Sequence, residues 1–168
     1  MKKIALLLTL FAGAISLQSC TIEEEYVQNT SAQVFELTTN FTYNNNYSVV
    51  YNFNPAIYSS DHVLVYRLWG QDGGDVWRLV PNTVFFTNGD EILYNFDHTR
   101  YDFRVFLEPN FDVESLTNQQ KNSYLANQTF RVVVVPGTFS AKMDYSNYES
   151  TIQALGLENT PVKTLQQK

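Results

Sequence analysis

Apolar and polar residues alternate along the chain from about residue 33 to residue 135. Phe35, Leu37, Phe41 and Tyr43 fall on one face of an extended segment, while Glu36, Thr38 and Asn40 fall on the other. A period of two is typical of a β-strand with one buried face. The same analysis predicts strands at 47–53, 62–69, 76–80, 83–87, 91–96, 101–108 and 129–137.

Turn signals separate these runs and predict how they pair. "NNN" at 44–46 favours a hairpin between 34–43 and 47–53, because asparagine tolerates the left-handed conformation of a tight loop. "GQDGGD" at 70–75 joins the next two strands. Asn88-Gly89 predicts a hairpin with a type I′ turn between 83–87 and 91–96. Connections this short favour antiparallel pairing.

Two short helices interrupt the β pattern. Thr117 begins a capping-box sequence, "TNQQ", and Ser146 with Glu149 forms another. Gly156 is a suitable C-terminal stop for the second helix.

The segments at 62–69 and 129–137 are apolar on both faces, which places them inside a sheet that is covered on both sides. We therefore expect an all-β protein: an antiparallel β-sandwich, Ig-like or jelly-roll-like, with about eight strands and one or two short helices. A lipocalin-like β-barrel is the alternative. The length of 168 residues fits one domain, at 33–156, followed by a C-terminal tail at 157–168.

The first 19 residues have the pattern of a secretory signal peptide. Lys2 and Lys3 precede an apolar run at 4–17, which is short for a membrane span. A retained anchor helix is the alternative. Leu17, Gln18, Ser19 and Cys20 resemble a bacterial lipobox, with an aliphatic residue, a small residue and then the cysteine.

The lipobox resemblance implies cleavage before Cys20 and lipidation of its thiol. Cys20 is the single cysteine of the chain, so it has no partner for an internal disulfide. Stable anchoring needs more than one acyl chain, which bacterial lipoproteins carry. We expect attachment to the outer membrane of the cell envelope, with residues 20–32 as a tether.

Glu23, Glu24 and Glu25 follow the cysteine closely. They resemble the surface-export signal of Bacteroidota lipoproteins and are a candidate for that role. A solvated, extended tether is the other interpretation. Exposure on the cell surface is therefore one expectation and a periplasmic face the other.

Charge excludes one class of partner. Lys and Arg number 11 and Asp and Glu 17, a net charge of −6. Nucleic-acid binding depends on phosphate neutralisation by basic residues, so we expect no nucleic-acid partner. The lipid must hold an acidic domain at an anionic membrane surface.

The motifs "VLVYRLW", "DVWRLVP", "LYNFDHT" and "TFRVVVVP" resemble those of small, uncharacterised Bacteroidota lipoproteins, especially flavobacterial ones. The likeness covers about residues 32–137. It implies an envelope location and a β-rich domain. It implies no activity and no site residues.

The sequence offers little catalytic chemistry. The histidines, His62 and His98, each follow an aspartate, and Gly-x-Ser-x-Gly is absent. With Cys20 committed to lipid, no nucleophile with a neighbouring base is evident. We expect no enzyme activity and no cofactor, with a hydrolase of unrecognised site as the least favoured reading.

Two weaker site hypotheses concern the 70–75 loop. Asp72 and Asp75 are a candidate calcium pair, although they lack EF-hand spacing, and a plain glycine turn is favoured. Trp69 and Trp77 flank the loop and are candidate ligand contacts. Packing in the core is favoured for both rings.

These observations favour a lipid-anchored envelope protein that acts as a non-catalytic binding or structural accessory. The alternative is a surface glycan-binding module that uses Trp69, Trp77 or tyrosines. Envelope proteins and glycans are the expected partners besides the membrane.

Overall fold

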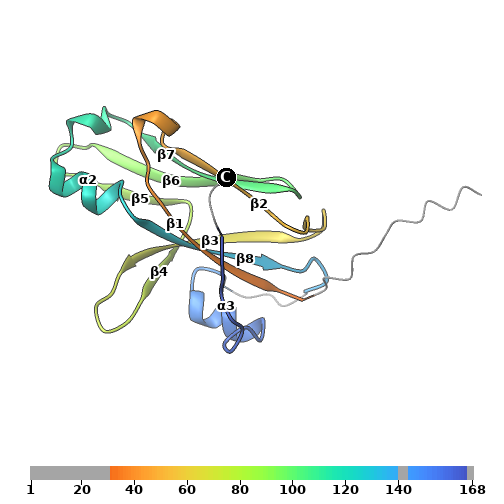
Figure 1. Cartoon of the computed structure of the whole chain (residues 1–168). Coiled ribbons are helices and arrows are strands. Elements are labelled where there is room, and N and C mark those ends of the chain that lie inside the picture. The colour runs from red at the N-terminus through yellow and green to blue at the C-terminus, as the bar shows by residue number, and fades with distance from the viewer. Residues whose placement is uncertain (1–30, 140–143, 166–168) are drawn as a thin grey trace, which may run out of the picture.

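The computed structural model describes residues 31–139 and 144–165 and contains two β-sheets packed face to face (Figure 1). The strands in chain order are β1 (Gln33–Thr39), β2 (Ser48–Asn52), β3 (His62–Gly70), β4 (Val76–Leu79), β5 (Asn82–Phe85), β6 (Glu91–His98), β7 (Asp102–Pro109), β8 (Gln128–Val135) and β9 (Lys163–Thr164). The helices are α2 (Asn118–Tyr124) and α3 (Tyr148–Ala154), with 3₁₀ turns at Tyr43–Asn45 and Val113–Ser115.

The first sheet has five strands in the order β4-β3-β8-β1-β9, and the second has four in the order β2-β7-β6-β5. All pairings are antiparallel except β1 with β9. The predicted antiparallel β-sandwich is confirmed. The barrel alternative is wrong, because the described strands form two separate sheets.

Strand β8 lies at the centre of the five-stranded sheet, with Val132 paired to Phe35 on one side and to Val65 on the other. Its last four residues, Val132 to Val135, are all buried. An unbroken β-branched run suits a strand covered on both faces. The predicted placement of 62–69 and 129–137 inside a sheet is confirmed for the strands they form, because β3 and β8 each lie between two other strands.

The predicted hairpin between 34–43 and 47–53 is wrong. β1 pairs with β8 and β9, whereas β2 pairs with β7 in the other sheet. Between them the chain crosses from one sheet to the other, and the Phe41 N–H donates to the Leu125 carbonyl. Alternation shows that each strand has a buried face, but two such strands can face each other across a sandwich instead of lying side by side.

The Asn88-Gly89 hairpin is confirmed, with a different turn. Gly89 has φ +81°, while Asn88 is not among the residues with positive φ. The Phe86 N–H donates to the Asp90 carbonyl and the Gly89 N–H to the Phe86 carbonyl. This is a type I turn closed by a left-handed glycine, the usual three-residue hairpin loop, and not the predicted type I′ turn.

Both short helices form near the predicted capping signals. The Thr117 hydroxyl accepts a hydrogen bond from the Gln120 N–H, and the Gln120 side chain accepts one from the Thr117 N–H. In α3 the cap is Asn147 and not Ser146. The Leu157 N–H donates to the Ile152 carbonyl across Gly156, which has φ +67° and ends the helix.

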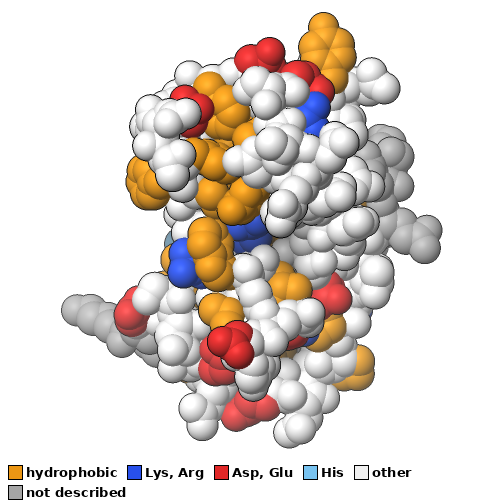
Figure 2. All heavy atoms as spheres, turned by 90° about the vertical axis from the view of Figure 1, so that its left-hand side faces the viewer, with side chains coloured by type: hydrophobic (Ala, Val, Ile, Leu, Met, Phe, Trp, Pro, Cys, Tyr) orange, Lys and Arg blue, Asp and Glu red, His pale blue; other side chains and the backbone are white. Residues whose placement is uncertain are grey.

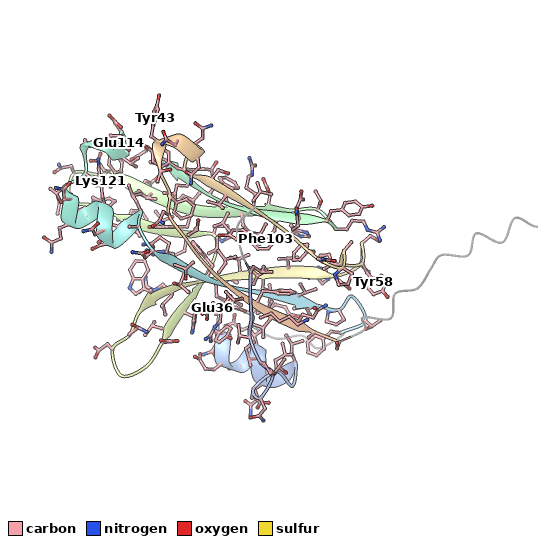
Figure 3. All side chains as sticks on the ribbon, viewed as in Figure 1. Glu36, Tyr43, Tyr58, Phe103, Glu114 and Lys121 are labelled. Atoms are coloured by element: carbon pink, nitrogen blue, oxygen red, sulfur yellow. The ribbon has the colours of Figure 1, made fainter. Side chains whose placement is uncertain are left out.

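The main core fills the space between the sheets and is rich in aromatic rings. Phe103, which Figure 3 places between the two layers, is 1% exposed. Its ring stacks on Tyr51 with centroids 5.5 Å apart and contacts Phe53 at 5.2 Å. Such ring pairs add to the free energy gained from burial alone.

A second hydrophobic cluster lies on the outer face of the five-stranded sheet, beneath α3. Tyr148 of α3 contacts Tyr66 of β3 and Trp77 of β4, with ring centroids 5.1 and 5.4 Å apart. The Tyr66 hydroxyl donates to the Tyr145 carbonyl at 2.7 Å. The helix therefore covers the apolar residues that β8 and β3 present on this side.

The ordered domain continues past the predicted boundary at 156. Leu157 is buried in the second cluster, and Lys163–Thr164 forms β9 alongside β1. The Leu165 N–H donates to the Glu36 carbonyl at 2.8 Å. Within the described residues, neither α2 nor α3 is long or apolar enough to cross a membrane.

Two phenylalanines provide a matched test of the core. We expect Phe103→Ala to lower the free energy of unfolding by about 3–5 kcal/mol, because it removes a fully buried ring. Phe85→Ala should change it by less than about 0.5 kcal/mol, since Phe85 is 75% exposed. Urea unfolding followed by circular dichroism measures both. Equal destabilisation by the two variants would contradict the described core.

Candidate functional site

A polar hollow of about 310 Å³ opens at the end of the sandwich where α2 lies. Residues 67–71 of β3 and its following turn line one side. Asn122, Ser123 and residues 126–129 line the other. We term it the β3–α2 hollow. Figure 2 views this end of the molecule and shows basic side chains beside hydrophobic ones in the middle of the face.

Side chains alternate between the two faces of β3, and this alternation points Arg67 into the interior at the hollow. Val63 and Val65 point into the main core, and Arg67 and Trp69 continue the same face of β3. Arg67 is only 4% exposed. A buried charge is costly unless it is paired and hydrogen-bonded, so the surroundings of this guanidinium determine what the site can do.

Gln128 fixes the Arg67 guanidinium. Its side-chain oxygen accepts hydrogen bonds from Arg67 Nε at 2.9 Å and from Arg67 Nη2 at 2.5 Å. Its side-chain nitrogen donates to the carbonyls of Ser123 and Ala126, at 3.1 and 2.7 Å. Gln128 thus joins the arginine to the end of α2 and orients it, but as a neutral amide it does not balance the charge.

Tyr94 of β6 contacts Arg67 from the opposite sheet. The guanidinium carbon lies 3.9 Å from the centre of the ring, a close cation–π contact. Burial raises the pKa of Tyr94 to about 12, so its hydroxyl stays protonated, and it donates to the Tyr124 carbonyl at 2.6 Å. Burial lowers the pKa of Arg67 from its very high usual value, although an arginine remains charged at neutral pH.

Trp69 forms part of the wall of the hollow and is 38% exposed. The guanidinium carbon of Arg78 lies 3.6 Å from the centre of the indole, and that of Arg67 lies 5.4 Å away. Because Arg78 contacts the ring so closely, it occupies part of the surface that a stacked ligand would use. The remaining exposed edge faces solvent at the hollow.

Trp77, the other candidate ligand contact, lies on the opposite face of the same sheet. It pairs with Leu68, one residue before Trp69, so the two indoles point to different sides. Trp77 is 8% exposed, beneath Arg131 at 4.3 Å and beside Tyr148. Trp69 therefore lines the hollow, whereas Trp77 lies in the second hydrophobic cluster, as the core-packing alternative predicts.

The calcium candidate, Asp72 and Asp75, gains no support. Gly73 and Gly74 between them have φ +76° and +150°, conformations that explain the glycines without an ion. Asp75 accepts a hydrogen bond from Gln71 Nε2 at 2.9 Å. Among the described residues, no group of three His, Cys, Asp or Glu side chains is placed to hold a metal, and calcium takes six to eight oxygens.

The histidines offer no catalytic arrangement within the described ranges. His62 begins β3 and His98 ends β6, so they belong to different sheets. Asp61 accepts hydrogen bonds from the Tyr58 and Gly137 N–H groups and so organises a turn. Asp97 pairs with Arg104.

The remaining sites predicted from sequence precede residue 31. The cleavage residues Leu17, Gln18 and Ser19, the lipidation site Cys20 and the candidate export signal Glu23, Glu24 and Glu25 all lie outside the described residues.

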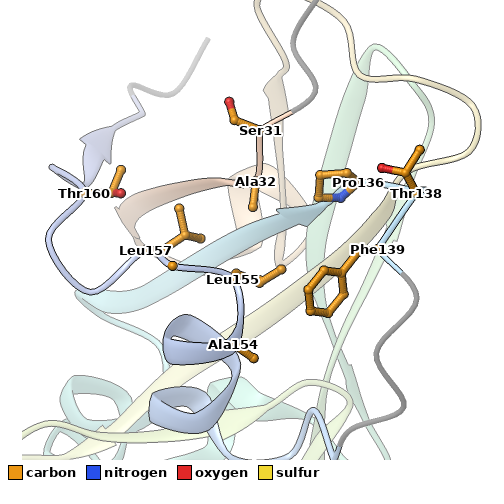
Figure 4. A pocket seen from close by; sticks show the side chains of 10 residues that line it. Ser31, Ala32, Pro136, Thr138, Phe139, Ala154, Leu155, Leu157 and Thr160 are labelled. Atoms are coloured by element: carbon orange, nitrogen blue, oxygen red, sulfur yellow. The ribbon is translucent and has the colours of Figure 1, made fainter.

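A larger hollow, of about 490 Å³, lies at the far end of α3 (Figure 4). Its described lining includes Ala32, Pro136, Phe139, Leu155 and Leu157 and carries no charged side chain. The smaller β3–α2 hollow is the stronger candidate, because it brings charged, amide and aromatic groups together.

Sequence reasoning missed Arg67, Arg78 and Gln128. One signal could have revealed Arg67: in "HVLVYRLW" it occupies the same alternating positions as Val63 and Val65. Gln128 carried no such signal, because its role depends on where α2 ends beside β3.

Comparison of the chain with protein-family models, curated proteins and solved structures finds no match in any of the three. The chemistry of the β3–α2 hollow is therefore the basis for a functional proposal.

The two tryptophans can be observed separately. In the Trp77→Phe variant the fluorescence comes from Trp69, and in Trp69→Phe it comes from Trp77. We expect acrylamide to quench Trp69 severalfold more strongly than Trp77, because only Trp69 is accessible to solvent. Equal, weak quenching of both would show that the hollow is closed in solution.

Proposed function

We propose that this chain is a non-catalytic binding protein of the bacterial cell envelope, anchored by lipid on Cys20, and that the β3–α2 hollow binds a saccharide. The observation that supports it is the combination of an exposed indole, a fixed arginine and several amide side chains around one hollow. Its volume of about 310 Å³ suits a small ligand, and a few placed polar groups are what fix the orientation of a ligand in such a site.

The hydrogen-bonding groups of the hollow suit sugar hydroxyls. Asn122 and Asn127 each offer two donors and one acceptor on a single side chain, and Ser123 and Thr129 add hydroxyl groups. Asn127 has φ +49°, and its N–H donates to the Asn40 side chain at 2.8 Å, so its position is fixed. Such groups can donate to and accept from neighbouring hydroxyls of one sugar ring.

α2 is itself held firmly against the sandwich. Lys121 Nζ lies 2.7 Å from Glu114 Oε2, and the Tyr47 hydroxyl donates to Glu114 Oε1 at 2.6 Å. Glu114 and Lys121 lie together in Figure 3, at the same end of the molecule as α2. The amide groups of the helix are therefore positioned before a ligand arrives, which lowers the entropic cost of binding.

The hollow also lies far from the tether. Gln33, where β1 begins, is opposite Val134, and His62, where β3 begins, is opposite Val135. Trp69 lies seven residues further along β3, which is about 23 Å at 3.3 Å per residue. Figure 1 accordingly shows the start of β1 and helix α2 at opposite ends of the sandwich. The hollow and the N-terminal end of the described chain therefore lie at opposite ends of the sandwich.

A purely structural role in the envelope is the second candidate. Phe85 on β5, at the edge of the four-stranded sheet, is 75% exposed and would suit a protein partner. A hydrolase has the least support, since the described histidines and carboxylates do not converge.

Saccharide binding can be tested on α2. We expect Asn122→Ala to weaken binding of the best ligand in a panel of oligosaccharides by about three- to tenfold, the value of one or two hydrogen bonds. Gln119→Ala, on the same helix but outside the hollow, should leave the affinity unchanged. Isothermal titration calorimetry measures both. Binding by no oligosaccharide, or equal weakening by the two variants, would refute the proposal.

The anchor can be tested independently. Cys20→Ala should move the chain from membrane pellets to the soluble fraction and leave its circular dichroism spectrum unchanged, because Cys20 precedes the described domain. Mass spectrometry of the wild-type protein should find an acylated Cys20 at the mature N-terminus. An unmodified chain beginning at Met1 would overturn lipid anchoring without affecting the saccharide proposal.

A further inference from the structure

Two positive charges lie on neighbouring strands at the β3–α2 hollow: Arg67 lines it, and Arg78 lies against Trp69, which also lines it. Arg67 of β3 and Arg78 of β4 are direct partners in the antiparallel register, so their side chains leave the same face of the sheet. Like charges in directly opposite positions destabilise a pair of strands. The arrangement therefore needs a compensating interaction.

No carboxylate of the described residues supplies it. The three ion pairs in the described ranges join Arg104 to Asp97, Lys121 to Glu114 and Arg131 to Glu36. Asp75, on the same hairpin, accepts its hydrogen bond from Gln71 and pairs with neither arginine. The arginines lack a carboxylate partner here although the net charge of the chain is −6.

The contacts that do hold the arginines are neutral. Gln128 and Tyr94 hold Arg67, and the indole of Trp69 lies against Arg78 at 3.6 Å. Cation–π contacts and amide hydrogen bonds orient the guanidinium groups and keep their charge uncompensated. A preorganised, uncompensated guanidinium is well suited to bind an anion, because charge-assisted hydrogen bonds are stronger than neutral ones.

We propose that the ligand of the β3–α2 hollow is an acidic saccharide, whose carboxylate or sulfate lies on the Trp69 side of the hollow near Arg67 and Arg78, while its hydroxyls meet the amides of Asn122 and Asn127. This inference rests on the proposed saccharide-binding function and specifies its ligand class. Figure 2 shows the basic groups in the middle of the face, with acidic side chains toward its top and bottom. The anionic group would enter where positive charge is concentrated.

The test compares ligands that differ only in charge. The purified full chain is titrated with a trimer of galacturonic acid, with the same trimer as its methyl ester, and with a sulfated chondroitin disaccharide and its unsulfated counterpart. We expect at least one acidic form to bind about tenfold more tightly than its uncharged or less charged counterpart at low salt. The difference should shrink as salt is added, since screening weakens the interaction.

Arg78 provides the decisive variant, because its side chain is exposed and its loss should not disturb the fold. Arg78→Gln should remove most of the preference for the acidic form, measured within the variant as the ratio of its affinities for the acidic and neutral forms. Arg100→Gln is the matched control: Arg100 is also exposed and lies over an aromatic ring, Tyr101 at 5.4 Å. The Arg100 carbonyl accepts from the N–H of Ile57, the neighbour of Tyr58, and Figure 3 shows Tyr58 at the end of the sandwich away from α2.

The outcomes separate the two proposals. A preference for the acidic form that Arg78→Gln removes and Arg100→Gln preserves would support both. Equal binding of acidic and neutral forms would overturn the acidic ligand and leave saccharide binding intact. Binding of none of these saccharides, together with none in the wider oligosaccharide panel, would overturn both.

Discussion

Burial of both faces of β8 is the constraint on which the rest of this fold depends. The strand pairs with β1 and β3, and its four consecutive valines alternate between the main core and the cluster beneath α3. A strand of this kind is stable only when both sides are covered. The four-stranded sheet covers one side, and α3 with Tyr148 and Leu157 covers the other. The short helix α3 is thus a necessary layer of the structure.

The candidate site lies at the end of the sandwich, where the apolar residues of the main core end. On the inner face of the five-stranded sheet, Val63 and Val65 give way to Arg67 and Trp69 on β3, and Phe130 gives way to Gln128 on β8. The alternation of side chains along β3 and β8 that builds the core therefore also places polar groups at its open end. Tyr94 reaches them from the opposite sheet, so both layers contribute to the hollow. The register of β3 against β8 places Arg67 and Gln128 there together.

Local patterns in the sequence predicted the strands well, because alternation, glycine turns and capping residues act over a few neighbouring positions. The eight expected segments and the two helices all form, with small shifts at their ends. The failure of the 34–53 hairpin shows the limit: alternation identifies a buried face but does not identify the partner strand. β9 was missed because two residues carry no periodicity. Lys163 and Thr164 become a strand only because β1 presents an edge.

The site was harder to predict for the same reason. Trp69 was recognised by its residue type, but its exposure and the burial of Trp77 depend on the register of β3 against β4, in which Leu68 faces Trp77. The pairing of Arg67 with Arg78 follows from that register as well. Gln128 is 61 residues from Arg67 in the sequence, and their hydrogen bonds exist only once β8 lies beside β3. Contacts at such separations are a property of the topology and leave no local signal.

The position of β1 gives this fold many contacts between residues that are far apart in the sequence. The four-stranded sheet uses only residues 48–109, whereas β1, the first strand of the chain, pairs with β8 and β9 near its end. Pairing at such separations is slow and leaves strand edges unpaired meanwhile. The β3–α2 hollow requires β8 beside β3 and α2 in place, so a ligand in that hollow would report a domain that has folded completely.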